Sequence, residues 1–110
     1  MAESPTVIAE GTQTAVIGTE HTLATDTTGK TYLLVVDGGN NANGDTLELR
    51  IYTKVRSTST ERLAYYEAFS NVLGEPNLYS VPVPADVSFK ATLKQTAGTG
   101  RDFDWKVLAL

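Results

Sequence analysis

The stretch "TLELRIYTKV", residues 46–55, decides the fold class. Its apolar positions Leu47, Leu49, Ile51 and Val55 alternate with polar or charged side chains. Successive side chains of a β-strand point to opposite faces of a sheet, so this period of two predicts a strand with one buried and one solvated face. We expect these four apolar side chains to face the core.

Three other segments follow related patterns. The run "KTYLLVVD" (30–37) is β-branched and aromatic with apolar residues on both faces, which is typical of a central strand. The segments "DVSFKATLKQ" (86–95) and "DFDWKVLAL" (102–110) alternate, although Leu108 and Leu110 interrupt the polar face of the second. The last strand is therefore expected to be covered on both sides.

Weaker strand signals lie elsewhere. Three Thr- and Val-rich pieces near the start, "TVIAEG", "QTAVIG" and "HTLATDT", are separated by turn residues. The segment "YSVPVP" is extended, and Pro82 and Pro84 place it at a sheet edge or a strand end because proline cannot donate to a ladder.

The stretch "TERLAYYEAFSNVLG", residues 60–74, fits two structures. A short amphipathic helix would place Leu63, Tyr66 and Phe69 on one side, and a strand would place Leu63, Tyr65 and Phe69 on one side. The β-rich surroundings and the preference of tyrosine and phenylalanine for pleated surfaces favour the strand.

About seven or eight short strands at near-regular spacing, joined by polar turns, predict an all-β fold: an antiparallel β-sandwich or a jelly-roll-like barrel. A chain of 110 residues has the size of one domain. We expect that domain to span residues 14–110, preceded by a flexible N-terminal arm at residues 1–13.

Composition narrows the class of function. The 41% hydrophobic and 20% charged residues fit a folded globular protein. A formal net charge of -4 does not supply the positive field of a nonspecific nucleic-acid binder, so nucleic acid is not an expected partner. There is no cysteine, and hence no disulfide or thiolate metal site. Neither a signal peptide nor a membrane span is predicted, and we expect no membrane partner.

Two glycine-rich loops are candidates for ligand chemistry. The loop "AGTGRDF" (97–103) lacks the Lys-Ser/Thr pair of a phosphate-binding loop and opens no helix, so a hairpin turn is expected. The loop "DGGNNANGD" (37–45) matches neither an EF-hand nor a repeated nonapeptide. A hairpin loop is favoured there, and calcium binding stays an alternative through Asp37, Asn40, Asn41, Asn43 and Asp45.

Catalytic patterns are weak. His21 is the single histidine, with no cysteine and no evident Ser-His-Asp context, so a surface or packed side chain is favoured. The carboxylate pairs Glu61 with Glu67 and Asp102 with Asp104 are explained by solvated strand faces. We therefore predict a protein that is not an enzyme, with no catalytic residue, cofactor, metal ligand or small-molecule substrate.

The tyrosines offer one further alternative. They fit either cross-strand packing in a small core, which is favoured, or a sugar-stacking platform. The residues concerned are Tyr52, Tyr65, Tyr66 and Tyr79.

The segments "GTEHTLAT", "TYLLVVDGGNNANGDTLELRIYTKV", "YSVPVP" and "FKATLKQTAGTGRDFDWKVLAL" resemble small virion proteins of tailed bacteriophages, from about residue 15 to the end. The resemblance implies a capsid decoration or cement protein that binds the outside of the assembled head and stabilises it. It also implies the major capsid protein and further copies of the chain as partners. The protein would be made in the bacterial cytoplasm and reside on the capsid surface of the virion.

On this hypothesis the N-terminal arm and a sheet edge contact the major capsid protein. The predicted partner-binding residues are Pro5, Val7, Ile8, Tyr52, Tyr79 and Arg101. Two alternatives stay open: a tail or neck component of the virion, and a carbohydrate-binding β-sandwich module used in host adhesion.

Overall fold

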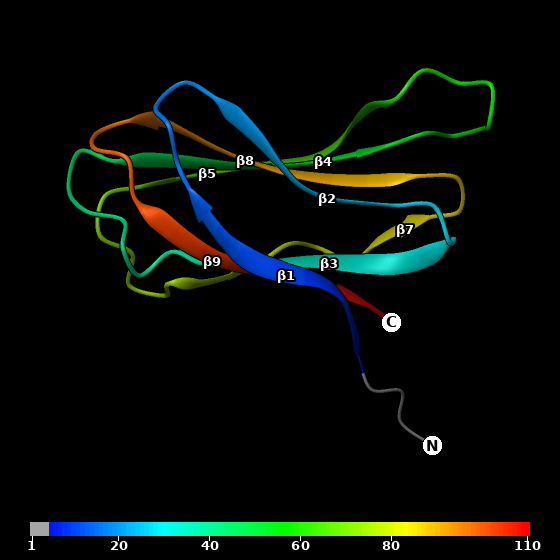
Figure 1. Ribbon diagram of the computed structural model, residues 1–110, viewed down its shortest axis with the longest axis horizontal. Helices are drawn as coiled ribbons and strands as arrows, with labels where there is room; N and C mark the ends of the chain where they lie inside the picture. The colour runs from blue at the N-terminus through cyan, green and yellow to red at the C-terminus, as the bar shows by residue number, and fades with distance from the viewer. Residues whose placement is uncertain (1–4) are drawn as a thin grey trace.

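The computed structural model describes residues 5–110, which form nine β-strands in two antiparallel sheets (Figure 1). Among these residues there is no helix that could span a membrane. The strands are β1 (Thr6–Thr14), β2 (Glu20–Asp26), β3 (Lys30–Asp37), β4 (Thr46–Thr53), β5 (Arg62–Ser70), β6 (Asn77–Tyr79), β7 (Val83–Ala85), β8 (Phe89–Ala97) and β9 (Asp102–Ala109).

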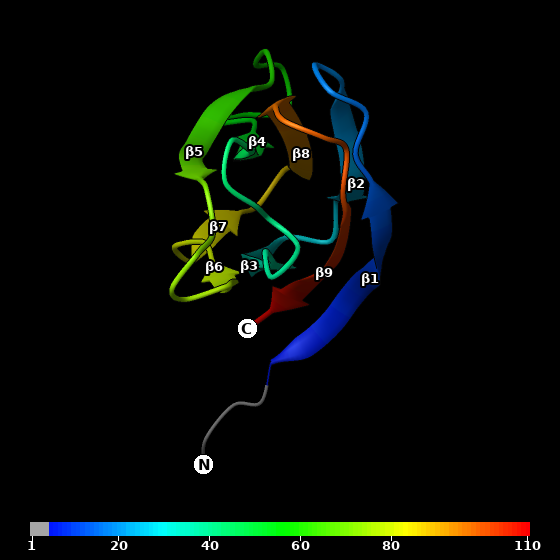
Figure 2. The ribbon, with the colours of Figure 1, turned by 90° about the vertical axis from the view of Figure 1, so that its left-hand side faces the viewer.

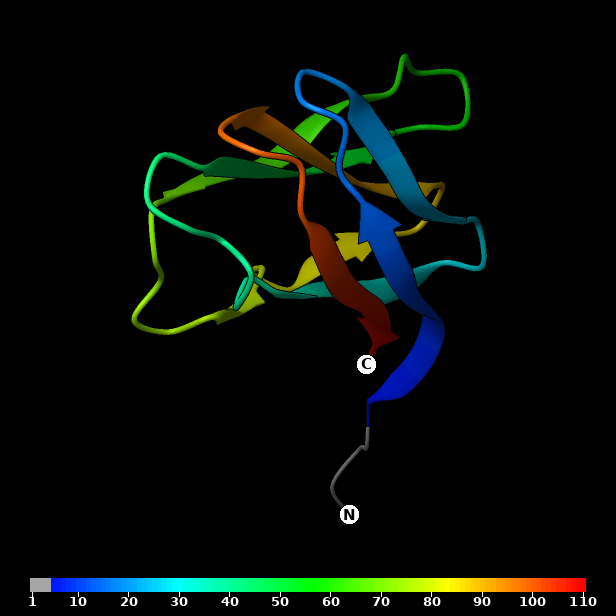
Figure 3. The same ribbon diagram turned by 60° about the vertical axis from the view of Figure 1, so that its left-hand side comes forward.

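The two sheets face each other as the layers of a sandwich (Figure 3). Sheet A has the order β1-β9-β3-β6, with β7 also paired to β3, and sheet B has the order β2-β8-β4-β5. Every connection except β4–β5 and β6–β7 passes from one sheet to the other. With β6 and β7 sharing one strand position, this is the strand order of a jelly roll. The predicted all-β sandwich is confirmed.

The break between β6 and β7, which both pair with β3, has a local cause. The backbone N–H of Ser80 donates to the Leu34 carbonyl at 2.9 Å, and the Ser80 hydroxyl accepts from the Leu34 N–H at 2.9 Å. Pro82 follows and has no N–H to continue the ladder, so pairing resumes only at Val83. Pro82 thus lies between two strands and Pro84 lies in the edge strand β7, as expected for prolines at a strand end or a sheet edge.

The core lies between the sheets and is made by inward side chains of β3, β4, β8 and β9. Tyr32 and Phe89 stack face to face across it, with ring centroids 4.3 Å apart. Of the four apolar positions predicted in "TLELRIYTKV", the first three are fully buried in β4. The fourth, Val55, is 83% exposed because β4 ends at Thr53 and Val55 belongs to the following loop.

The strand interpretation of residues 60–74 is confirmed for β5, with one correction to its facing. Tyr65 is the register partner of Ile51 and Leu63 is the partner of Tyr52, which leaves Ala64 as the extra residue of a β-bulge. The bulge reverses the alternation. Leu63 therefore lies on the outer face, and Tyr65 and Phe69 face inward.

Three segments differ from expectation. Residues 6–14 pair with β9 along strand β1, so a separate arm over residues 1–13 is wrong for residues 6–13. Residues 1–4 lie outside the described part. The loops 38–45 and 98–101 were predicted as hairpins, but each carries the chain from one sheet to the other. Strand alternation sets facing and does not say which strands pair, so this difference was invisible in the sequence.

Candidate functional site

The outer face of sheet B carries a connected set of charged and aromatic side chains. Glu20 of β2 accepts hydrogen bonds from the hydroxyls of Tyr52 at 2.6 Å and Thr92 at 2.7 Å. The Lys90 ammonium lies 4.6 Å from the centroid of the Tyr52 ring and forms an ion pair with Glu61 at 2.9 Å. These contacts join β2, β8, β4 and the β4–β5 loop.

The same face is equally well connected toward β5. Arg50 forms an ion pair with Glu48 at 2.7 Å and lies 4.9 Å from the centroid of the Tyr66 ring. The Tyr66 hydroxyl donates to Glu48 at 3.0 Å. Burial acts to raise the pKa of Glu20, but the hydrogen bonds from Tyr52 and Thr92 and the charges of Arg50 and Lys90 together lower it below its usual range. The charged side chains on the outer face of sheet B are thus paired with neighbours within the chain.

The outer face of sheet A is different and carries an apolar area. Leu33 and Val35 of β3 and Leu108 of β9 point away from the core, and Val7 of β1 is the register partner of Leu108. Val35 is 8% and Leu108 9% exposed although Figure 1 shows no layer beyond this sheet. Val7 and Tyr79 flank them and are 48% and 62% exposed. We call this set, with Leu110, the apolar area of sheet A.

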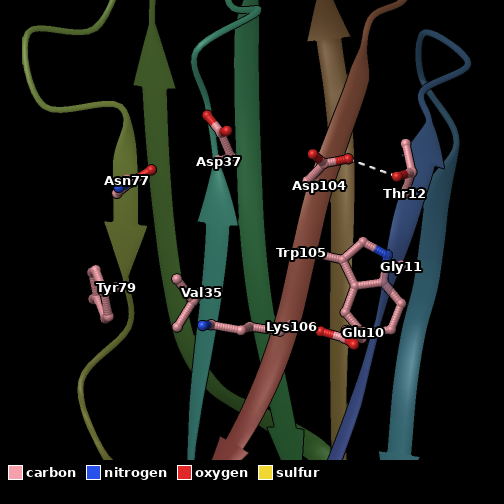
Figure 4. Close-up of a pocket in the computed structure, with 10 residues that line it drawn as sticks. All are labelled: Glu10, Gly11, Thr12, Val35, Asp37, Asn77, Tyr79, Asp104, Trp105 and Lys106. Carbon is pink, nitrogen blue, oxygen red and sulfur yellow. Dashed lines mark hydrogen bonds between the residues drawn. The ribbon is translucent and has the colours of Figure 1, made fainter. Parts of the chain in front are cut away.

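An open hollow of about 550 Å³ lies beside this area across β1, β9, β3 and β6. Figure 4 shows its side chains in two rows across the strands. One row contains Tyr79, Val35, Lys106 and Glu10, in agreement with the register of the four strands. The hollow therefore combines an exposed aromatic ring, an aliphatic centre and side chains of both charges.

The second row of the hollow is polar, with Asn77 and Asp37 at one end. At the other end the Thr12 hydroxyl donates to Asp104 at 2.6 Å, the one hydrogen bond among the residues drawn in Figure 4. One step further along, the Thr14 hydroxyl donates to Asp102 at 2.7 Å. Asp102 and Asp104, which the sequence offered as a pair of candidate acids, thus each accept a hydrogen bond from a threonine.

Asp45 joins the two glycine-rich loops. Its carboxylate accepts from the backbone N–H of Ala42 at 2.9 Å, the N–H of Thr99 at 3.2 Å and Nε of Arg101 at 2.9 Å. The N–H of Ala42 is the largest cause that holds the pKa of Asp45 below its usual range, and Arg101 lowers it further. The loop at Gly98 has a φ of +92°, and a side chain there would enter the Asp45 carboxylate. The loop 98–101 is therefore a turn with a structural role.

Several possible calcium ligands of residues 37–45 are engaged with other parts of the chain. Asp45 already serves three donors, including a cationic one, and Asp37 accepts from the Gly39 N–H at 2.9 Å. Asn41 is buried and donates to the Asn71 carbonyl at 2.9 Å. Within residues 5–110 no group of three or more His, Cys, Asp or Glu side chains is placed to hold a metal ion.

The other candidate residues are dispersed. Glu61 pairs with Lys90, whereas Glu67 lies on the inward side of β5. His21 accepts a hydrogen bond from the Val16 N–H at 3.1 Å through Nε2. The four tyrosines do not form one platform, because Tyr79 lies on sheet A and the other three lie on β4 and β5 of sheet B.

The predicted partner-binding residues fall into two groups. Val7 and Tyr79 lie exposed on the outer face of sheet A, and Pro5 lies exposed just before β1. The structure thus brings the first two onto the same face and places the third beside it.

The remaining three are engaged within the chain. Ile8, at the bulge of β1, packs against the core. Tyr52 belongs to the connected side chains of sheet B, and Arg101 binds Asp45.

Sequence reasoning omitted Val35 and Leu108 from the partner-binding set. A signal for both was present, since each stands on the face of its strand where an apolar residue breaks the alternation. Lys106 and Asn77 of the hollow carried no signal, because solvated lysines and asparagines are common on strand faces.

Comparison of the chain with protein-family models, curated proteins and solved structures gave no match in any of the three.

Proposed function

We propose that this chain is a non-enzymatic structural protein of a tailed bacteriophage that binds the outer surface of the assembled capsid and stabilises it. Its partners are the major capsid protein and further copies of itself. It is made in the bacterial cytoplasm and resides on the capsid surface. The proposal rests on the resemblance of the sequence to small phage virion proteins and on the unequal outer faces of the two sheets.

The contrast between the faces supports the choice of contact surface. On sheet B, ion pairs and hydrogen bonds connect Glu20, Arg50 and Lys90 to neighbours of the same face. On sheet A, Val7 and Tyr79 are exposed beside aliphatic residues of β3 and β9. Burial of such apolar surface is the main favourable contribution to most protein association. Sheet A is therefore the proposed capsid-facing side.

The jelly roll agrees with this proposal without deciding it. Capsid and lectin domains both use this fold, and one fold hosts many functions. The apolar area of sheet A, rather than the fold, is the structural observation that supports the proposal.

A binding experiment with matched variants tests the proposal. The purified protein is mixed with empty expanded capsids, the particles are sedimented, and the pellet is imaged by cryo-electron microscopy. Regular density at symmetry-related positions, with sheet A toward the shell, is the expected result. Val7→Ser and Tyr79→Ser should each weaken binding, whereas Val55→Ser, which changes an exposed valine in the β4–β5 loop, should not. Bare capsids with folded protein left in solution would rule out decoration.

Images of intact virions separate decoration from a tail or neck location. In intact virions, density confined to the tail or the neck would move the protein to that position.

A carbohydrate-binding module is the second candidate, and the hollow on sheet A favours it. Tyr79 stands exposed beside Asn77 and Asp37, a combination of aromatic ring, amide and carboxylate that suits a sugar. A glycan array distinguishes the two candidates. Binding that Tyr79→Ser abolishes, together with bare capsids, would establish this second function.

A further inference from the structure

We propose that two copies of this chain pair antiparallel along their β5 strands, with Arg62 of each copy opposite Glu67 of the other. The inference extends the self-association that belongs to the proposed function, and it assigns that association to a surface other than the capsid-facing side of sheet A. The two copies would join their B sheets into one continuous sheet across a two-fold axis.

β5 is an edge strand with an unpaired side. It is the last strand of sheet B, hydrogen-bonded only to β4, and Figure 2 shows no segment beyond it. It is nine residues long, and its middle, "LAYYEAF", is aliphatic or aromatic apart from Glu67. An edge strand of this length and composition is a template for pairing with another chain. β1 and β2, the other long edge strands, are richer in threonine and other polar residues.

The sandwich is open on the inward side of β5. Sheet A ends on this side in β6 and β7, which have three residues each, so it covers β5 incompletely. An open hollow of about 670 Å³, lined by Phe69, Leu73, Leu78 and Tyr79 among others, lies there. Phe69 and Tyr65 are accordingly only partly buried. A second copy paired along residues 62–67 would lie beside Tyr65, which the fold of one chain leaves partly open.

The charges of β5 specify the partner. Arg62 and Glu67 both lie on the inward side, as register partners of Thr53 and Leu49. The three ion pairs of residues 5–110 include neither of them. In an antiparallel pair, two residues of one strand that carry opposite charges satisfy each other twice across a two-fold axis. A second copy is thus complementary to this edge.

The bulge at Ala64 selects one register. Opposing residues of antiparallel strands share a face, and the bulge places Arg62 and Glu67 on the inner face and Leu63 and Tyr66 on the outer face. When Arg62 faces Glu67 of the second copy, Leu63 faces its Tyr66, so both pairs match. A register displaced by one residue would place side chains of unlike faces opposite each other. The two-fold axis then passes next to the bulge, where the small alanine leaves room.

Charge reversal tests the pairing without capsids. Sedimentation equilibrium of the purified chain should show a concentration-dependent monomer–dimer equilibrium that high salt weakens. Arg62→Glu and Glu67→Arg each place like charges opposite each other at two positions, and each should raise the dissociation constant about tenfold or more. The double variant restores opposite charges and should return it to within about threefold of the original. Arg56→Glu, in the exposed β4–β5 loop, is the matched control.

A wild-type chain that stays monomeric at about 1 mM, the weak end of specific association, would overturn the proposal. Single reversals without effect, or a double variant as weak as the single ones, would do the same for this register. All these outcomes are read with no capsid present. Failure here therefore leaves decoration by sheet A standing, and bare capsids would leave the dimer standing.

Cross-linking tests the register directly, because the chain has no cysteine. Leu63→Cys mixed with Tyr66→Cys should give a disulfide-linked dimer of unlike chains on mild oxidation. Either variant alone should link weakly, since residues three positions apart along the pair exceed the reach of a disulfide. Circular dichroism establishes that each variant is folded. Equal linking of Leu63→Cys with itself would contradict the register.

Discussion

Arg101 and Asp45 lie 56 residues apart in the chain, yet Nε of the arginine donates to Oδ2 of the aspartate at 2.9 Å. The contact joins two loops, each of which carries the chain from one sheet to the other. It therefore fixes both crossings at one end of the sandwich relative to each other.

Replacement of Asp45 should destabilise the fold. Asp45→Ala removes a buried carboxylate and leaves the N–H groups of Ala42 and Thr99 without their acceptor. We expect the free energy of unfolding to fall by about 2–4 kcal/mol. Urea denaturation measures this change. Asp86→Ala, at an exposed position, should stay within about 0.5 kcal/mol of the original. Equal effects of the two substitutions would refute the role of Asp45.

Asp45 should also give stability an acid-sensitive component. Its pKa is held below the ordinary value of 3.8, so the folded state binds its proton less readily than the unfolded state. The stabilisation is fully present above the ordinary pKa and is lost as pH falls through the lower folded value. The difference in unfolding free energy between the original and Asp45→Asn should therefore shrink below roughly pH 5. A difference independent of pH from neutral to strongly acidic solution would contradict this assignment.

Gly98 and Gly44 allow the loss of stability caused by an added side chain to be compared at two positions. Both have positive φ, but a Cβ at Gly44 meets nothing within 4 Å whereas one at Gly98 would enter the carboxylate of Asp45. Gly44→Ala should cost about 1–2 kcal/mol from backbone strain alone. Gly98→Ala should cost about 3 kcal/mol or more, because steric displacement of Asp45 adds to the strain. Thermal and urea unfolding give both numbers, and equal costs would count against the close approach.

Tyr32 should control the titration of Asp26. Its hydroxyl donates to the Asp26 carboxylate at 2.6 Å and is the largest cause that lowers the pKa of that carboxyl. Tyr32→Phe should raise the pKa of Asp26 toward its ordinary value and cost about 1–2 kcal/mol of stability. Carbon-detected NMR titration of Asp26 measures the shift. Tyr79→Phe alters an exposed hydroxyl and should leave Asp26 unchanged.

Strand alternation predicted the fold class and the inward residues Leu47, Leu49 and Ile51 of β4. It did not predict which strands pair, because facing is a local property whereas pairing depends on the path of the whole chain. The bulge at Ala64 was equally hidden, since an inserted residue is visible only against the partner strand. For the same reason Leu63 was assigned to the wrong face.

The candidate surface shows a similar division. Val7 and Tyr79 were predicted to contact a partner, and the structure places both on sheet A. Arg101 was predicted with them because an isolated exposed arginine and one engaged with a distant aspartate look the same in sequence. The difference between the outer faces of the two sheets depends on contacts across several strands, so it appears only in three dimensions.

The repeated passage between the sheets also determines how the chain reaches its fold. Within the described residues, β4 and β5 are the one pair of consecutive strands that are hydrogen-bonded to each other, whereas β1 must find β9 at the opposite end of the chain. Closing such long loops before any contact forms makes folding slow, on the order of milliseconds to seconds. We expect the β4–β5 hairpin to nucleate folding. Destabilising substitutions in it should slow folding, while those between β1 and β9 should mainly accelerate unfolding.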